Sequence, residues 1–509
     1  MVKKTKSPKD RKVKIQYDDL DKGYRRPAVR LNQINLDYIK ETVLKNRFTA
    51  ILSIIIIIGA FLRFYHLDFN SLWLDEAVTA DFSNKSFLDI WNITAGGGGE
   101  YHPPLFYWLE HIMLSFGNNE ITLRLVPAIV GILTIPLTYF AGKEFMDKRA
   151  GLIAAALIAF SPFHLFYSQE ARSYTLMLFF VSLVFLFLLR GLKEPGARPW
   201  IFFGVFAAMA LWAHFLTAIP LAIFWGFAIG YTWIKRWNMA EVKKKFKNIL
   251  LSIAIFVVIT LPLLVVTVRL FLAITATAPT YGIQGWPVIS QSVLQMSGFN
   301  LAVTVFLLIL FGTGLLVLYT SDIAKLMLIL AFSIIPLVAS VFLSYKMPML
   351  PRYLIYLLPA YFIGIAASYR TIYSFFRSDK VAYGFAILFF LIQIQAGMNY
   401  YTAYSKEDWR GFSTVMQQIV KAQDVIVLAP AYMRTPFDYY YHNDSGTVKE
   451  MGANTLDELK KTRISRRIAP STSSSPAIFT PWTRKAKWWT GSRIIQRFSG
   501  NTPGLTCSS

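Results

Sequence analysis

Long apolar segments separated by short polar turns occupy most of the chain between residues 48 and 398. An α-helix needs about 20 apolar residues to cross a bilayer, and runs of this length recur throughout this part of the sequence. The pattern therefore predicts a mainly α, polytopic membrane protein with about 11 transmembrane helices. The expected spans are residues 48–66, 121–142, 150–167, 174–190, 200–216, 218–234, 249–268, 300–319, 324–343, 353–369 and 381–398.

A long loop and a polar N-terminal segment lie outside these spans. Residues 1–47 are polar and basic, and we expect them to form a cytoplasmic tail. Residues 67–120 form the first outer loop, which is longer than a connection between neighbouring spans requires. Its apolar stretch at residues 103–116 is too short to cross a bilayer and predicts a juxtamembrane helix.

The chain becomes more polar after the last expected span. A helical pattern at residues 406–421, a buried strand at residues 424–430 and a further helix from Pro436 predict a small outer-side α/β domain at residues 401–461. Residues 462–509 mix Ser, Thr, Lys, Arg and Pro without a clear period. They fit a basic, poorly ordered tail. A disturbed reading frame in the underlying gene would give the same kind of composition.

Composition supports the membrane interpretation. Charged residues make up 16% of the chain, against about 25% in soluble domains. The net charge of +23 could indicate a nucleic-acid partner. However, Lys and Arg cluster in alternate turns, as expected for cytoplasmic loops of a membrane protein. We therefore expect no nucleic acid, a cytoplasmic N-terminus, and the first loop on the outer face. The single cysteine, Cys507, excludes an internal disulfide.

The first outer loop carries two adjacent carboxylates, Asp75 and Glu76, and closes on His102-Pro103-Pro104. Adjacent carboxylates can serve as a general base or as ligands of a cation. They are equally typical of a helix start, where the helix dipole favours negative charge. Pro103 restricts the backbone of His102 and could aim its imidazole, although His102 could also be a helix-entry residue without substrate contact.

Charged side chains also mark the outer ends of several spans. Arg63 and Arg124 either reach to the interface or pair with Asp75 or Glu76, because an unpaired charge within the membrane is costly. Arginine donates parallel hydrogen bonds to phosphate. Further candidates for the outer-side substrate site are Glu170, Arg172, Lys346 and Arg352, with His214 as a weaker addition. Converging arginines would fit a lipid-linked phosphate, whereas each charge could also simply reach to the interface.

Several catalytic motifs are absent from the sequence. It contains no Gly-rich phosphate loop, no zinc-type His spacing and no serine nucleophile elbow. Residues 96–99 are four glycines, which we interpret as a flexible joint because no strand leads into them. No soluble α/β domain of the kind found in nucleotide-sugar enzymes precedes the membrane region.

The ordered set of motifs resembles the GT-C superfamily of membrane glycosyltransferases. Within it, the chain is most similar to the dolichyl-phosphate-mannose protein mannosyltransferases and the aminoarabinose transferases of lipid A. The resemblance extends over about residues 60–410 and is carried by Trp73-Leu74-Asp75-Glu76, His102-Pro103-Pro104-Leu105, Arg124 with Pro127, Ser168-Gln169-Glu170-Ala171-Arg172-Ser173-Tyr174, Pro351-Arg352-Tyr353 and Lys406-Glu407-Asp408-Trp409-Arg410.

The resemblance implies a transmembrane catalytic domain at residues 48–400 that moves a sugar from a polyprenyl-phosphate donor to an acceptor. It implies that Asp75 is the catalytic base, that Glu76 and Arg124 organise the site, and that His102 faces the substrate. The lipid A branch has a lysine at the position of His102, so the chain is less similar to that branch. We expect an inverting enzyme in the plasma membrane of a prokaryote, with a protein, lipid or glycan acceptor.

Some alternatives stay open at this stage. No cofactor is certain, and a divalent cation such as Mg²⁺ or Mn²⁺ would be held by Asp75, Glu76 and Glu170. A lipid-linked-substrate transporter or flippase would also carry charges along a membrane path, but it predicts inverted repeats, which the sequence does not display. A polysaccharide polymerase or ligase would use the same donor and move a whole glycan.

Overall fold

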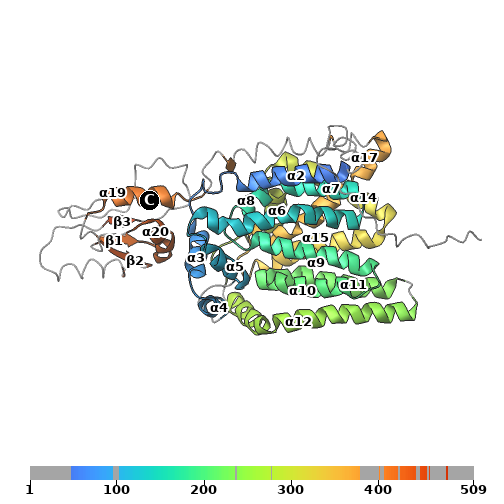
Figure 1. Cartoon of the computed structure of the whole chain (residues 1–509), viewed down its shortest axis with the longest axis horizontal. Helices are drawn as coiled ribbons and strands as arrows, with labels where there is room; N and C mark the ends of the chain where they lie inside the picture. The colour runs from blue at the N-terminus through green and yellow to red at the C-terminus, as the bar shows by residue number, and fades with distance from the viewer. Residues whose placement is uncertain are drawn as a thin grey trace, which may run out of the picture. The chain divides into compact units, whose positions relative to one another are not determined.

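The computed structural model describes residues 47–95, 102–235, 238–276, 278–378, 384, 400–401, 406–421, 425–442, 448–454, 458 and 477–479. The chain divides into two compact units, Met1–Ala50 and Ile51–Ser509, and the described part of the first unit is the beginning of helix α2. The described residues are helical apart from three short strands and the connecting turns (Figure 1).

Long apolar helices make up most of the described residues. Eight of these segments are long and apolar enough to span a membrane. They are α2 (Arg47–Phe64), α6 (Glu120–Phe145), α9 (Tyr174–Lys193), η2 (Phe215–Thr217) with α11 (Ala218–Ile234), α12 (Met239–Thr275), α14 (Leu301–Ser321), α15 (Ile323–Leu343), and η3 (Pro351–Leu357) with α16 (Leu358–Ala367) and α17 (Tyr369–Phe376). Helices α7 (Lys148–Phe160) and α8 (Pro162–Ser168), bent by 59° at their junction, form a ninth if they cross together.

The predicted multi-pass membrane fold is confirmed. Ten of the eleven expected spans coincide with these segments or with α10 (Arg198–Ala213), an apolar helix that is shorter than the others. The remaining expected span, residues 381–398, lies outside the described residues except for Gly384. The count of eleven therefore stays a prediction.

Close backbone contacts hold neighbouring membrane helices together. A Cβ atom added to Gly142 would lie 2.9 Å from the Cα of Gly151, so α6 and α7 can approach this closely only through glycine. In the same way, a Cβ on Gly314 of α14 would lie 1.9 Å from the carbonyl oxygen of Gly364 in α16. Helices α9, α10 and α12 also run side by side (Figure 1).

Three short helices form the first loop: α3 (Leu74–Ser83), α4 (Phe87–Ala95) and α5 (Leu105–Leu114). Helix α5 occupies the stretch from which the sequence predicted a short juxtamembrane helix. It packs against both α3 and α6. A fourth short helix, α13 (Pro287–Met296), lies in the connection between α12 and α14. The loop helices are thus packed elements rather than an extended linker.

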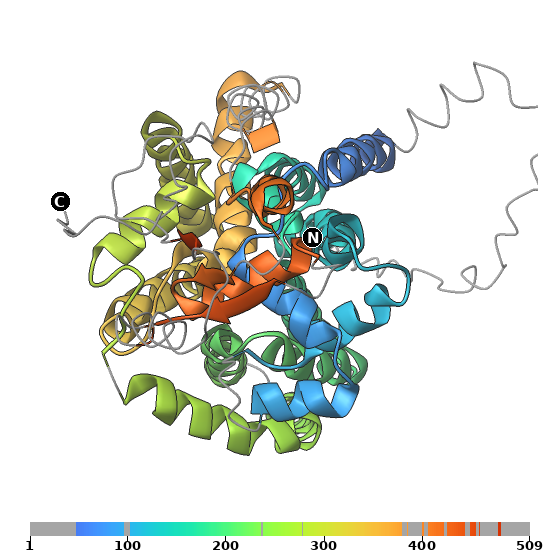
Figure 2. The ribbon, with the colours of Figure 1, turned by 90° about the vertical axis from the view of Figure 1, so that its left-hand side faces the viewer.

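The C-terminal region, comprising the described residues 406–479, combines helices with a small sheet. Its elements are α19 (Trp409–Ile419), β1 (Val425–Leu428), η4 (Ala431–Met433), α20 (Arg434–Tyr440), β2 (Lys449–Gly452) and β3 (Ala477–Phe479). The strands lie in the order β2-β1-β3, and both pairs are parallel (Figure 2). Strand β3 falls within residues 462–509, which were expected to be a poorly ordered tail, so the sheet extends beyond residue 461.

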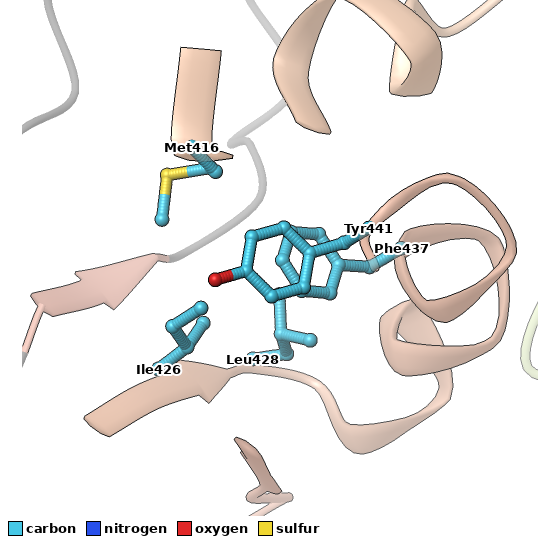
Figure 3. Close-up of a cluster of buried hydrophobic side chains, with 5 residues drawn as sticks. All are labelled: Met416, Ile426, Leu428, Phe437 and Tyr441. Atoms are coloured by element: carbon cyan, nitrogen blue, oxygen red, sulfur yellow. The ribbon is translucent and has the colours of Figure 1, made fainter. Parts of the chain in front are cut away.

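Alternation along strand β1 builds the core of the C-terminal region. Successive side chains of a strand point to opposite faces, so Ile426 and Leu428 lie on the same face. Both are buried against Met416 of α19 and against Phe437 and Tyr441 at α20 (Figure 3). The buried strand expected at residues 424–430 is thereby confirmed.

Candidate active site

A buried ion cluster anchors the beginning of α3. The Glu76 carboxylate is fully buried and accepts hydrogen bonds from Arg124 Nε at 2.9 Å and Nη2 at 2.8 Å. It also accepts from Lys406 Nζ at 3.0 Å and from the backbone N–H of Ala171 at 2.9 Å. Burial alone would raise the pKa of Glu76, but Arg124 and Lys406 outweigh it and hold the pKa at about 2.

Arg124 ties this cluster to the loop that precedes α3. Its Nη1 donates to the carbonyl oxygens of Leu67 and Asn70, each at 2.8 Å, and its Nη2 donates to the carbonyl oxygen of Ser71 at 3.1 Å. Of the two roles left open for Arg124, the structure shows pairing with Glu76. Arg124 and Glu76 therefore hold the loop in place, and neither carboxylate oxygen of Glu76 is left open for a substrate.

Asp75 is the more accessible of the two adjacent carboxylates. Its side chain is 27% exposed, and its Oδ2 lies 3.4 Å from Nη2 of Arg352. Arg352 in turn lies over the rings of Trp73 at 5.2 Å, Tyr174 at 5.6 Å and Tyr353 at 5.7 Å. A guanidinium stacked in this way keeps its charge while its position is fixed. Asp75 and Arg352 thus form a carboxylate–cation pair that is only partly buried.

A second arginine lies on the backbone side of Asp75. Arg172 Nη1 is 3.4 Å from the carbonyl oxygen of Asp75 and 3.4 Å from the hydroxyl of Tyr107. Its Nη2 lies 3.3 Å from Nδ1 of His102, and the His102 ring meets the His214 ring edge-on with centroids 5.3 Å apart. The structure therefore brings Arg172, His102 and His214 together beside Asp75, as the sequence predicted for residues of one site.

Glu170 is a buried acid near the same groups. It lies in the turn between α8 and α9 and is 1% exposed. Burial raises its pKa to about 7, with smaller contributions from Glu76 and Asp75, while Lys406 and Arg352 act in the opposite direction. Its Oε1 has no hydrogen-bond partner within the described part of the chain. Glu170 is therefore close to its point of ionisation at neutral pH.

The turn that carries Glu170 is fixed by its neighbour Gln169. The Gln169 amide donates to the carbonyl oxygens of Leu62 at 3.3 Å, Arg63 at 3.0 Å and Tyr65 at 2.9 Å. These carbonyls belong to the end of α2, where the helix leaves backbone acceptors unsatisfied. Helix α2 and the turn at residues 169–173 thus stabilise each other through the backbone of α2.

Arg63 does not belong to this site, and both roles expected for it are wrong. It is fully buried and donates to the carbonyl oxygens of Ile158 at 3.2 Å and Ala159 at 3.1 Å. Its Nη2 also lies 2.7 Å from Nδ1 of His164. Pro162 lacks the N–H that would have bonded to Ile158 in a continuous helix. Arg63 therefore supplies hydrogen-bond donors at the bend between α7 and α8.

Lys346 also lies apart from the candidate site residues. It lies exposed in the turn after α15, and among the described residues its side chain forms no hydrogen bond or ion pair with Asp75, Glu170 or Arg352. Of the cations expected to bind a phosphate, Arg172 and Arg352 are the two that contact Asp75 in the described part of the chain. Exposure at the end of a membrane helix is typical of a lysine that reaches to the interface.

Sequence reasoning missed Lys406 as a site residue. Its side chain is 4% exposed and pairs with Glu76, which lies 330 positions earlier. The motif that begins with Lys406 was noticed, but no role followed from its spacing. A signal was present, because Lys406 lies shortly after the outer end of the last expected span, residues 381–398, and a position near an outer span end had singled out Arg63 and Arg124.

The three acids considered as metal ligands do not form a metal site. Both Glu76 oxygens already accept hydrogen bonds from Arg124, and Asp75 is paired with Arg352. Among the described residues, no group of three or more His, Cys, Asp or Glu side chains could hold a metal ion. Arg124 and Arg352 thus engage the carboxylate oxygens that a divalent ion would need as ligands.

Comparison with known protein families supports the resemblance. The family model for dolichyl-phosphate-mannose-protein mannosyltransferase matches residues 101–266. An "Uncharacterized protein" of Aquifex aeolicus (strain VF5) is 25% identical over 169 residues, covering 32% of this chain and 29% of that protein. The "Putative mannosyltransferase YycA" of Bacillus subtilis (strain 168) is 25% identical over 219 residues, covering 41% and 30%. The chain spans less than a third of the length of these curated relatives.

Solved structures extend the similarity to most of the chain. ArnT from Cupriavidus metallidurans, bound to undecaprenyl phosphate, superposes with a TM-score of 0.57 at 14% identity, covering 84% of this chain and 93% of ArnT. The apo oligosaccharyltransferase from Archaeoglobus fulgidus gives a TM-score of 0.52 at 13% identity, covering 80% and 65%. The GT-C fold expected from the sequence motifs is thereby confirmed, as is the resemblance to the protein mannosyltransferase and ArnT-like group.

Proposed function

We propose that this chain is an integral membrane glycosyltransferase that transfers a sugar from a polyprenyl-phosphate-linked donor to an acceptor, with inversion at the anomeric carbon. The observation that carries the proposal is the accessible Asp75 carboxylate beside the guanidinium of Arg352, with the guanidinium of Arg172 at the backbone carbonyl oxygen of the same residue. This arrangement combines a base for an acceptor with cations for a phosphate. The acceptor is a protein, a lipid or a glycan.

Unpartnered polar atoms support a polar ligand at this place. Buried polar groups are nearly always hydrogen-bonded in folded proteins. Within the described part of the chain, partners are lacking for Trp73 Nε1, Glu170 Oε1, the Tyr174 hydroxyl and Arg352 Nε. Arg352 lies over the rings of Trp73 and Tyr174, and its charge influences Glu170. These atoms would bond to the donor phosphate and its sugar.

The comparisons agree with a lipid-phosphate donor. The ArnT structure holds undecaprenyl phosphate, and the archaeal oligosaccharyltransferase AglB, with a TM-score of 0.51, was solved with an inhibitory peptide and a dolichol-phosphate. In this chain, Arg352 and Arg172 are the side chains suited to the phosphate, since guanidinium forms strong charge-assisted hydrogen bonds with phosphate oxygens. The donor lipid would lie among the membrane helices.

The chemistry follows from the position of Asp75. The acceptor hydroxyl gives its proton to the Asp75 carboxylate while its oxygen attacks the anomeric carbon from the side opposite the phosphate. The bond between that carbon and the phosphate oxygen breaks, and its electrons leave with the polyprenyl phosphate. A positioned base contributes about 10²- to 10⁴-fold to the rate, and the two arginines stabilise the charge that develops on the phosphate.

Donor binding would also prepare the base. In the structure, Oδ2 of Asp75 is paired with Arg352. A phosphate that binds Arg352 competes with Asp75 for the guanidinium, which frees the carboxylate oxygen for the acceptor hydroxyl. Because the site residues do not form a carboxylate metal site, we derive no step from a divalent cation.

We place the reaction on the outer face of a prokaryotic plasma membrane, with the N-terminus in the cytoplasm. The support is the alternation of basic turns, since Lys and Arg concentrate in cytoplasmic loops. The turns after α6 and α9 and the one before α12 carry clusters of Lys and Arg. The turns that carry Asp75, Glu170 and Arg352 are on the opposite side of this alternation.

The test is transfer by the purified chain. The protein in detergent is incubated with radiolabelled polyprenyl-phosphate sugars and protein, lipid or glycan acceptors, with and without chelator. We expect a single labelled sugar to appear on an acceptor with inverted anomeric configuration. Movement of an intact donor between leaflets of a liposome without cleavage would support a flippase instead, and transfer of a preassembled glycan would support a ligase. Either result would overturn the proposal.

A further inference from the structure

A short segment directly after the membrane region, residues 406–410, contacts the loop that carries Asp75. Lys406 Nζ lies 3.0 Å from Oε2 of Glu76, the residue next to Asp75. Both side chains are almost completely buried. The Lys406 ammonium also lies over the ring of Phe166, 5.7 Å from its centroid. Lys406 is therefore a buried counter-ion of α3.

The Ser71 side chain joins the backbone of the same segment to the residues before α3. The Ser71 hydroxyl donates to the carbonyl oxygen of Glu407 at 2.5 Å and accepts from the backbone N–H of Trp409 at 3.1 Å. Ser71 is itself fully buried. The two chain segments, 336 to 338 positions apart, thus meet through the Ser71 hydroxyl and the backbone of Glu407 and Trp409.

A second ionic contact lies around Glu120, at the start of α6. Arg410 donates to Oε1 of Glu120 from Nε at 3.0 Å and from Nη2 at 2.6 Å, and its Nη2 also donates to the carbonyl oxygen of Asp68 at 2.8 Å. The Tyr440 hydroxyl donates to Glu120 at 2.7 Å and accepts from the backbone N–H of Leu72 at 2.7 Å. Helix α20 thereby contributes to the same contact.

These contacts matter for Asp75 because its carboxylate has little support of its own. The hydrogen bond that the described residues give to its side chain comes from Arg352, which a donor phosphate would engage. The direction of Asp75 must then be set by the backbone of α3 at residues 74–76, and this backbone is held through Glu76. Placement errors of about 1 Å can cost 100-fold in rate.

We propose that residues 406–410 and Tyr440 form a clasp that holds the first loop, with Lys406 acting through Glu76 as a positioning residue for Asp75. The proposal rests on the proposed glycosyl transfer. It assigns a role to the C-terminal region: this region completes the site rather than binding the substrate. Removal of the Lys406 charge should leave donor binding intact and impair the chemical step.

The kinetic test uses Lys406→Met in the intact chain. We expect kcat to fall by about 10- to 100-fold with the donor KM unchanged, and Lys406→Arg to restore most of the rate because it keeps the charge. Arg434→Met is the matched control, since Arg434 forms an exposed ion pair with Asp438 within α20. Wild-type kcat in Lys406→Met, or a higher donor KM at unchanged kcat, would overturn the proposal.

A second measurement does not depend on activity. Hydrogen exchange of the backbone amides at residues 68–77 should be faster in Lys406→Met and in Glu120→Gln than in the wild type and in Arg434→Met. Unchanged exchange would contradict the clasp even if kcat falls, since Lys406 would then act in another way. If the wild-type chain transfers no sugar, the proposed function fails, whereas the exchange result still decides whether residues 406–410 hold the loop.

Discussion

At the scale of single residues, two adjacent carboxylates have opposite surroundings. Glu76 is fully buried and bonded to Arg124, Lys406 and a backbone amide, whereas the Asp75 side chain is 27% exposed beside Arg352. A carboxylate with both oxygens engaged by fixed cations cannot readily accept a proton. We therefore assign structural support to Glu76 and the proposed base function to Asp75.

Replacement of Arg352 by lysine tests the proposed phosphate contact. Lysine keeps the charge but loses the planar fork and the stacking over Trp73 and Tyr174. Loss of a charge-assisted hydrogen bond costs about 1.5–3 kcal/mol, so we expect the donor KM to rise about 10-fold or more. Steady-state kinetics with varied donor measures this. Arg269→Lys, at an exposed position of α12, is the control, and an unchanged donor KM in Arg352→Lys would contradict the assignment.

Glu170 predicts a pH dependence of donor binding. Its neighbours are the acids Asp75 and Glu76 and the cations Lys406 and Arg352, and its pKa is raised by burial to about 7. Below this pH the acid is neutral; above it, a negative charge competes with the donor phosphate for Arg352. We expect the donor KM to rise as the pH passes about 7, and this rise to be absent in Glu170→Gln.

The same shift affects stability with a definite sign. The pKa of Glu170 is raised in the folded state from 4.5 to about 7, so the folded protein binds more protons than the unfolded one between these values. Stability therefore falls as the pH rises through this window.

The donor KM prediction has its own contradicting outcome. A donor KM profile with the same inflection in Glu170→Gln as in the wild type would assign the titration to another group.

At the scale of elements, the break between α7 and α8 shows how a buried arginine can serve the backbone. Ser161 adopts an extended conformation before Pro162, and its hydroxyl accepts from the N–H of His164. The carbonyls of Ile158 and Ala159 are then bonded by Arg63. The bend directs α8 to the turn that carries Glu170, so Arg63 influences the site only through this geometry.

Arg63→Met separates this role from substrate binding. The variant leaves buried carbonyl oxygens without their donor, at a cost of about 1–3 kcal/mol for each unsatisfied group. We expect a lower melting temperature than that of the wild type, together with an unchanged donor KM. The control is Arg190→Met, because Arg190 lies at the end of α9 in a partly exposed pair with Glu144. A higher donor KM in a stably folded Arg63→Met protein would return Arg63 to the binding site.

The sequence patterns predicted the secondary-structure elements more successfully than they predicted the contacts between side chains. The spans could be found because each is a long apolar run, and Asp75 could be found because an unusually long loop carries it. The partners of Arg63 are backbone carbonyls, which look alike in every sequence, so its role could not be predicted. Lys406 was missed as a site residue because its contact with Glu76 depends on the path of the whole chain between them.

At the scale of the whole molecule, the site is assembled from distant parts of the sequence. Asp75 comes from the start of α3, Glu170 and Arg172 from the turn before α9, and Arg352 from η3. Lys406 comes from the C-terminal region. The fold is shared with ArnT at 14% identity, so the arrangement of helices persists where most side chains differ, and the function has to be argued from these few residues.

Asp75→Asn tests the central claim most directly. Asp81→Asn is the control, because Asp81 lies on the same helix and forms an exposed pair with Lys85, just beyond the end of that helix. Donor binding and sugar transfer are measured on one preparation of each intact protein. We predict that Asp75→Asn inserts into the membrane and binds the donor, but transfers sugar about 10²- to 10⁴-fold more slowly than the wild type or Asp81→Asn. Wild-type transfer by a folded Asp75→Asn protein would contradict Asp75 as the base.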